Sequence, residues 1–365
     1  MAEQESLTIE PWLQSLWDRG GTDLLLSGGS APRIRVDGKL NPIEGAAILS
    51  GKEIEKIAEP LLTSGQRLVF EEQMDVDFAF SWGDRARIRG SVFTQRGEMS
   101  LALRVIPARI PTFEDLGLPY AANWVAEQPR GFVLVTGPTG SGKSTTLASI
   151  VDKVNTDRAC HILTIEDPVE YVHHHKTSAV NQREIGLDSP SFDRALRSAL
   201  REDPDVLLIG EMRDIDSIQI ALTMAETGHL VFATLHTNDA PQAIDRIIDV
   251  FPAWRQEQTR VQLAASLSAV IAQRLIPKIG GGMVAAFEVL IATNPVRNLI
   301  REGRSNQLSN VMFTNTKEGM QTLENSLARM IIDGVVTYED AMANTAHPKE
   351  LVRTLEQMDS TRVKV

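Results

Sequence analysis

A glycine-rich run, GPTGSGKST at residues 137–145, is the part of the sequence best suited to chemistry. It satisfies the pattern G-x-x-x-x-G-K-[ST], which binds phosphate where it joins a strand to a helix. Glycine lets backbone N–H groups turn inward around phosphate oxygens, and the N-terminus of the following helix adds the positive end of its dipole. The predicted phosphate contacts span the whole run: Gly137, Pro138, Thr139, Gly140, Ser141, Gly142, Lys143, Ser144 and Thr145.

Lys143 and Ser144 give this run its predicted chemistry. In sites of this kind the lysine reaches the β- and γ-phosphates of ATP, and the hydroxyl binds Mg²⁺. The alternative is a glycine-rich turn without a ligand. A predicted strand at 131–137 and a predicted helix from about 143 favour the phosphate site, because the motif requires that context.

Three later strand ends carry groups that could hold a metal ion and orient a water. HILTIEDP ends in Glu166-Asp167, DVLLIGE ends in Glu211, and HLVFATLH runs from His229 to His236. Each residue alone could be a solvated or structural side chain. Groups at the carboxyl ends of strands in an open α/β sheet meet at one edge. Together, and downstream of a phosphate loop, they favour a site that hydrolyses ATP.

Short apolar runs alternate with helical patterns from Arg130 onward. The runs GFVLVTG, HILTIED, DVLLIGE and HLVFATLH are typical of strands buried on both faces of a parallel sheet. Helical segments lie between them, such as KSTTLASIVDKVN and SIQIALTMAETG. The alternation predicts an α/β fold with a mainly parallel sheet. We expect the residues from about 255 onward to be mostly helical.

The first part of the chain has a different organisation. DLLLSGG, APRIRVDGKLNPI and RARIRGSVF read as strands, with a hairpin signal at Asp37-Gly38, and three segments between residues 8 and 73 read as helices. This predicts a smaller α+β domain at 1–108. The prolines at 107, 111 and 119 mark 109–125 as the predicted linker, and the ATPase domain is expected at 126–365.

Charge and composition exclude several classes of function. A net charge of -11 argues against a protein that coats nucleic acid. The single cysteine, Cys160, excludes an internal disulfide and a cysteine-built zinc site. The N-terminus lacks a signal pattern, and no apolar run approaches the roughly 20 residues that span a bilayer. We expect a cytoplasmic protein without a nucleic-acid partner or direct membrane insertion.

Four segments in order resemble the Walker A, Asp box, Walker B and His box of secretion-superfamily, GspE-like ATPases. They are GPTGSGKSTT, TIEDPVEYVH, LRSALREDPDVLLIGEMRD and ETGHLVFATLHTND. Within that superfamily nearly the whole chain resembles the PilT-type retraction ATPases of type IV pili. The resemblance implies a RecA-like P-loop NTPase domain after a PAS-like domain, in a homohexameric ring that uses ATP and Mg²⁺ to power pilus retraction. It also implies contact with an inner-membrane platform protein at the cytoplasmic face, with a paralogous pilus ATPase as a further candidate partner.

The resemblance also distributes the catalytic roles. Many P-loop ATPases end the Walker B strand in Asp-Glu, but in this family it usually ends in Gly-Glu, so Gly210 is the expected residue. Glu211 would join Ser144 in binding Mg²⁺, partly through water, and Glu166 would activate the attacking water. Which glutamate takes the proton stays open. His229 and His236 would sense the γ-phosphate or link neighbouring sites.

Arginines outside the ATPase domain complete the predicted site. Arg89 and Arg104 match arginine-bearing strands of the family and would reach a neighbouring subunit's nucleotide, whereas Arg87 matches less well. The chain has Arg89-Gly90-Ser91 where the family more often has Arg-Val-Asn. The alternative is that these arginines line the exposed side of an alternating strand.

Two further segments bear on the function. NPVRNLIREGR resembles the retraction signature, with Arg297 and Arg301 on one helix face for coupling or partner contact. His173-His174-His175 favours a polar loop over a metal site.

Two alternatives to a retraction motor stay open: an accessory, nucleotide-gated ring with little hydrolysis, and a pilus-extension or type II secretion ATPase. Extension ATPases typically carry a four-cysteine zinc site, which this chain cannot form.

Overall fold

The computed structural model describes residues 8–36, 38–212 and 214–362, with side chains up to residue 358. These residues form two compact units. The first comprises Met1–Arg109 and Pro168–Val172, and the second comprises Ile110–Asp167 and His173–Val365. None of the helices in the described part of the chain combines the length and hydrophobicity that a bilayer-spanning helix requires.

The first unit is built on a six-stranded antiparallel sheet in the order β3-β2-β1-β6-β5-β4. Its strands are β1 (Asp23–Leu26), β2 (Arg33–Val36), β3 (Lys39–Pro42), β4 (Asp75–Trp82), β5 (Ala86–Gln95) and β6 (Glu98–Pro107). Its helices are α1 (Glu10–Asp18), α2 (Gly51–Ala58) and α3 (Ser64–Gln73). β2 and β3 pair with Val36 opposite Lys39, as the hairpin signal predicts, although Asp37 itself lies outside the described residues.

The strands of the first unit alternate between a buried and an open face. In β5 the residues Ala86, Ile88 and Val92 are buried, so the intervening arginines at 87 and 89 lie on the other face. A smaller α+β unit ahead of the α/β unit agrees with the fold class predicted from the sequence.

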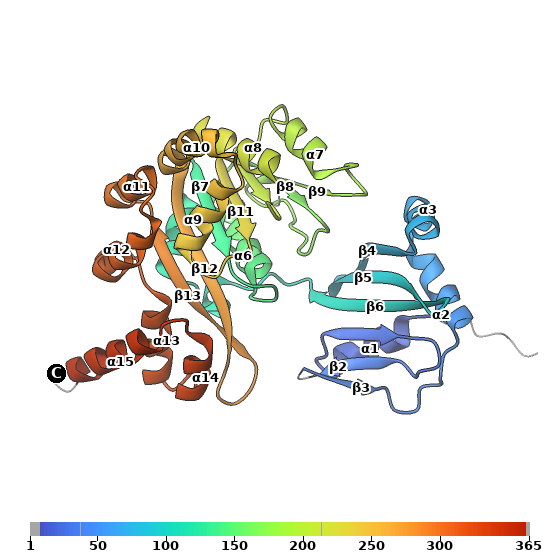
Figure 1. Cartoon of the computed structure of the whole chain (residues 1–365). Coiled ribbons are helices and arrows are strands. Elements are labelled where there is room, and N and C mark those ends of the chain that lie inside the picture. Colours follow the sequence, from blue (N-terminus) through green and yellow to red (C-terminus); the bar gives the residue numbers. More distant parts are fainter. Residues whose placement is uncertain (1–7, 37, 213, 363–365) are drawn as a thin grey trace, which may run out of the picture. The chain divides into compact units, whose positions relative to one another are not determined.

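The second unit contains a seven-stranded sheet in the order β13-β12-β7-β11-β10-β8-β9 (Figure 1). All neighbours are parallel except the β12–β13 pair, which confirms the predicted mainly parallel α/β fold. The strands are β7 (Gly131–Thr136), β8 (His161–Glu166), β9 (Ala179–Glu184), β10 (Val206–Ile209), β11 (Leu230–Leu235), β12 (Leu267–Pro277) and β13 (Met283–Ile291).

Helices cover both faces of this sheet, which explains why its central strands are apolar throughout. β7 sends Phe132 and Leu134 into one buried cluster and Val133 and Val135 into another. The second cluster includes α5 (Tyr120–Glu127) and α6 (Lys143–Asp157). The first is covered by α7 (Phe192–Ala199), α8 (Ile215–Glu226), α9 (Ala240–Asp249), α10 (Ala253–Ser266), α11 (Asn294–Arg301) and α12 (Leu308–Thr314).

Residues from about 255 onward are mostly helical, as expected, but they also contain two strands that the sequence did not predict. β12 and β13 form a long hairpin, paired from Ala269 opposite Ile291 to Pro277 opposite Met283. Beyond it lie α13 (Leu323–Ile332), α14 (Tyr338–Asn344) and α15 (Pro348–Arg362). Figure 1 shows the hairpin running down to α13 and α14, which pack on β13 and β12.

The segment 109–125, expected as a linker, carries α4 (Phe113–Leu116) and most of α5, and both belong to the second unit. Its prolines lie where a helix tolerates them. Pro119 occupies the N-cap position of α5, ahead of the first helical residue. Ala121, Ala122 and Val125 of α5 are buried in the core of the second unit.

Candidate active site

The phosphate loop and three of the predicted residues meet at one edge of the parallel sheet. β7, β11, β10 and β8 are consecutive parallel neighbours, so their carboxyl ends lie together. The phosphate loop follows β7, His236 follows β11, Glu211 follows β10, and Glu166 ends β8. This is the edge at which open α/β sheets bind their ligands.

The phosphate loop closes around the Lys143 side chain. Its Nζ donates to the carbonyl oxygens of Gly137 at 2.8 Å and Pro138 at 3.1 Å, and the residue is only 9% exposed. α6 begins at Lys143, as predicted, and Ser144 is exposed at its N-terminus. A buried ammonium group beside the N-terminus of α6 makes this loop strongly attractive to anions.

Glu211 and His236 form a pair at neighbouring strand ends. His236 Nε2 lies 3.0 Å from Glu211 Oε1, and their side chains are 47% and 28% exposed, so the pair faces solvent. The next residue, Thr237, ties this loop to the phosphate-loop strand, because its carbonyl accepts from Thr136 Oγ1 at 2.6 Å. The histidine loop therefore touches both the Walker B strand and the strand before the phosphate loop.

Glu166 is oriented by two donors. Thr164 Oγ1 donates to Glu166 Oε1 at 2.7 Å, and Gln182 Nε2 donates to the same oxygen at 3.3 Å. Thr164 and Gln182 face each other across the β8–β9 pair. Both contacts hold the carboxylate at the sheet edge.

Gly210 allows the ends of β8 and β10 to approach closely. A Cβ at this position would lie 3.2 Å from the Ile165 carbonyl oxygen and 3.3 Å from Glu166 Cα. A larger residue would push the two strand ends apart, and with them the two glutamates. Glycine before Glu211 thus allows a closer approach of these strand ends than a residue with a Cβ would.

His229 does not join this group, which corrects its predicted place beside the phosphate. It precedes β11, whereas His236 follows that six-residue strand, so roughly 20 Å separate them. Its Nδ1 lies 2.9 Å from the Met224 carbonyl oxygen and 3.2 Å from Thr227 Oγ1, at the end of α8. Its link to a neighbouring subunit stays a prediction.

Arg89 and Arg104 lie directly opposite each other on β5 and β6. They line a hollow of about 290 Å³ on the open face of the first unit's sheet, together with Asp23, Arg35 and Asp77. Arg104 Nε donates to Asp23 Oδ1 at 2.9 Å, and Arg89 Nη1 lies 3.4 Å from Glu170 Oε1. Arg87 contacts Ser81 instead.

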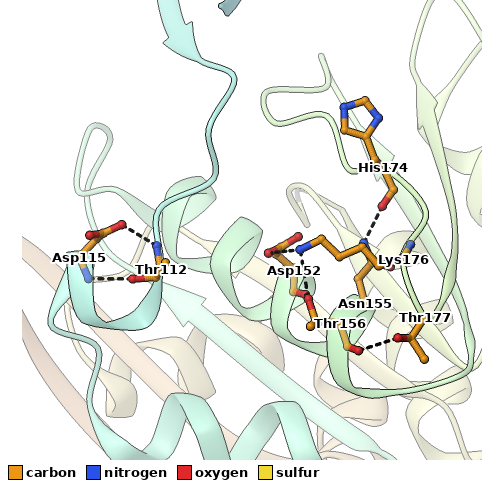
Figure 2. Close-up of polar contacts among 8 residues, drawn as sticks. All are labelled: Thr112, Asp115, Asp152, Asn155, Thr156, His174, Lys176 and Thr177. Carbon is orange, nitrogen blue, oxygen red and sulfur yellow. Dashed lines mark hydrogen bonds and ion pairs between the residues drawn. The ribbon is translucent and has the colours of Figure 1, made fainter. Parts of the chain in front are cut away.

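The three consecutive histidines take separate partners. The His173 backbone N–H donates to Gln182 Oε1, His175 Nδ1 accepts from the Val180 N–H, and the His174 carbonyl accepts from Asn155 Nδ2. Burial lowers the pKa of His173 to about 4, so its ring is neutral at pH 7. Figure 2 shows this loop fastened to α6, with Lys176 bound to Asp152 and Thr156.

Arg297 and Arg301 differ in their surroundings, although both lie on α11. The Arg297 guanidinium turns inward, where its Nε donates to the Ala292 carbonyl and its Nη1 to those of Ala264 and Ala265. It thereby caps the last turn of α10, as arginines do at helix C-termini. Arg301 is exposed.

Sequence reasoning missed the residues that hold the site in place. Thr164 and Gln182 orient Glu166, but only the β8–β9 register brings them together. Gln273 of β12 contacts the phosphate loop, and one signal marked it: a polar amide interrupts the apolar run LSAVIAQRLI.

The oxygen donors at this edge fit Mg²⁺. Ser144 offers a hydroxyl at the start of α6, and Glu211 offers a carboxylate two strands from β7. Mg²⁺ commonly takes one or two protein oxygens and completes its shell with water and phosphate. A site with few protein ligands next to a phosphate loop suits that coordination.

Comparison with known proteins gives consistent matches over most of the chain. The family model described as type II/IV secretion system protein matches residues 33–362. A Pseudomonas aeruginosa protein described as the type IV pilus retraction ATPase PilT is 47% identical over 331 residues, which cover 91% of this chain and 96% of that protein. The type IV pilus ATPase PilU of the same organism is 40% identical over 94% of this chain and 90% of PilU.

A solved structure has the same fold. The crystal structure of the pilus retraction motor PilT with bound ADP matches with a TM-score of 0.88 at 46% identity, over 95% of this chain and 99% of that one.

Proposed function

The chain belongs to the type II/IV secretion system protein family, and from that premise we propose that it is an ATP-hydrolysing motor that powers retraction of type IV pili. The assignment as a retraction ATPase rests on the similarity to PilT over nearly all of both chains. The observation that carries it at the site is the meeting of the phosphate loop, Glu166, Glu211 and His236 at one sheet edge.

The same contacts support a division of labour in hydrolysis. The loop from Gly137 to Thr145 would bind the phosphates, with Lys143 at the β- and γ-phosphates. Ser144 and Glu211 would hold Mg²⁺, which when bound neutralises charge developing on the phosphate oxygens. Water attacks the γ-phosphorus, the bond to the β,γ-bridging oxygen breaks, and a carboxylate takes the water proton. We assign that proton to Glu166, since Glu211 already engages His236.

The motor would act as a homohexamer. Arg89 and Arg104 would extend from one subunit toward the nucleotide of the next, as guanidinium groups suit phosphate oxygens. ATP binding would favour one arrangement of the subunits and hydrolysis another. Force would pass to an inner-membrane platform protein, which would place the ring at the cytoplasmic face.

An accessory role is the second candidate, because one organism carries two pilus ATPases that are similar to this chain, PilT at 47% and PilU at 40% identity. ATP turnover by the purified protein separates the two roles. We expect the wild-type protein to hydrolyse ATP, and Lys143→Ala and Glu211→Ala each to lower kcat by about 100-fold or more. Equal turnover in all three proteins would contradict the assignment of this protein as an ATPase. Slow turnover by the wild type that rises only with a paralogue would favour the accessory ring.

A further inference from the structure

Gln273 is a buried amide at the back of the phosphate loop. It lies in β12, only 5% exposed, where β12 runs parallel to β7 with Ala272 opposite Thr136. Gln273 follows Ala272 in β12, and Gly137, the first glycine of the phosphate loop, follows Thr136 at the end of β7. A buried amide in an apolar strand requires partners for its donors and acceptor.

Both ends of the Gln273 side chain bind the phosphate-loop region. Its Nε2 donates to the Ser141 carbonyl at 2.7 Å, and its Oε1 accepts from Thr146 Oγ1 at 2.7 Å. Ser141 lies inside the loop, and Thr146 lies in the first turn of α6. One side chain thus connects the loop to the helix that follows it.

Two glycines of the loop lie so close to Gln273 that a side chain on either would collide with it. A Cβ on Gly142 would lie 2.8 Å from Gln273 Nε2, and a Cβ on Gly137 would lie 2.3 Å from the Gln273 carbonyl oxygen. Both glycines also have positive φ, 87° and 148°. The loop therefore packs directly on β12, with Gly142 against the side chain of Gln273 and Gly137 against its main chain.

We propose that Gln273 is a positioning residue for nucleotide binding: it holds the Ser141 carbonyl outward, so that the loop N–H groups turn toward the phosphates. The proposal rests on the ATP site proposed above. The Gln273 amide is bonded to Ser141 and Thr146, so it would act through the loop and not by contact with the nucleotide. Losing it leaves a buried carbonyl unpaired and lets the loop relax, which costs affinity for any ligand that carries a β-phosphate.

Gln273→Met tests this, because methionine has similar length and no strong donor or acceptor. Gln321→Met is the matched control: Gln321 Nε2 also donates to a backbone carbonyl, that of Phe287 at 2.9 Å on β13, which β12 separates from β7 and the phosphate loop. We expect Gln273→Met to raise the Kd for ADP about tenfold, with Gln321→Met within about twofold of wild type, although both lower the melting temperature. Wild-type affinity in folded Gln273→Met, or equal losses in both variants, would overturn the proposal.

Two further variants keep the test decisive if Gln273→Met does not fold. Gln273→Glu keeps the acceptor for Thr146 but places an oxygen against the Ser141 carbonyl, so we expect a loss at least as large. Thr146→Val removes only the helix-side bond, so we expect a much smaller loss. The reverse order would overturn the proposal. ATP turnover by the wild type, measured on the same preparations, separates failure of this proposal from failure of the proposed function. An inactive wild-type protein would contradict its assignment as an ATPase but not the role of Gln273.

Discussion

Glu166 and Glu211 stand at neighbouring strand ends with different partners. Glu166 accepts from a hydroxyl and an amide, whereas Glu211 is paired with His236. Gly210 brings their strands together. Two carboxylates at the same sheet edge as the phosphate loop can divide proton transfer and metal binding between them.

Glutamine substitutions separate these two roles. Gln keeps the size of each side chain but cannot take a proton or bind Mg²⁺ as a carboxylate does. We expect Glu166→Gln to abolish turnover while ATP binding still tightens with Mg²⁺. Glu211→Gln should lower turnover and also weaken the dependence of ATP affinity on Mg²⁺. Titrations with and without Mg²⁺ measure this, and the opposite pattern would exchange the assignments.

At the scale of elements, the β12–β13 hairpin connects the sheet edge of the candidate active site to the C-terminal helices. Glu288 of β13 accepts from the N–H of Ala240, the first residue of α9, at 2.8 Å, and from the N–H of Leu323, the first residue of α13. α9 follows the loop that carries His236. One buried carboxyl group therefore joins the histidine loop to the C-terminal helices.

Glu288 gives this connection a predicted pH dependence. Burial raises its pKa to about 8, with Asp239 and Glu324 adding to the rise and the two N–H groups opposing it. Because the folded pKa lies above the unfolded value of 4.5, the folded state holds the proton more tightly. The stability linked to Glu288 is therefore full below about pH 4.5 and is lost as the pH rises through 8.

Thermal unfolding of Glu288→Gln tests this prediction. The amide does not titrate, so we expect the stability of wild type relative to the variant to fall between pH 5 and pH 8, by a few kcal/mol at about 1.4 kcal/mol per pKa unit. Glu257→Gln, an exposed carboxylate on α10, serves as the control and should track the wild type. A constant difference across this range would show that Glu288 does not titrate there.

Local sequence patterns predicted the strands and helices whose own residues show a clear apolar or amphipathic pattern. The four apolar runs became β7, β8, β10 and β11 because both faces of each are buried. The β12–β13 hairpin was missed because α10 passes into β12 between Ser266 and Leu267 with no glycine or proline. Positions set by partners distant in sequence, such as Gln182 beside Glu166, could not be read from the chain.

At the scale of the whole molecule, the two units would serve different steps of the proposed motor cycle. The second unit holds the phosphate loop and the catalytic edge, and the first unit presents Arg89 and Arg104 around a hollow on its open sheet face. In a ring, a site completed by a neighbour's arginines would link hydrolysis in one subunit to movement of the next. That link is what a motor requires.

Imaging of labelled pili in living cells tests the motor most directly. The host would carry a deletion of this gene, complemented by the wild-type protein or by Lys143→Ala expressed at equal levels. We predict that pili extend and retract with the wild type, and that they accumulate without retracting with Lys143→Ala. Retraction at the wild-type rate with Lys143→Ala, or cells without pili after deletion, would contradict an ATP-driven retraction motor.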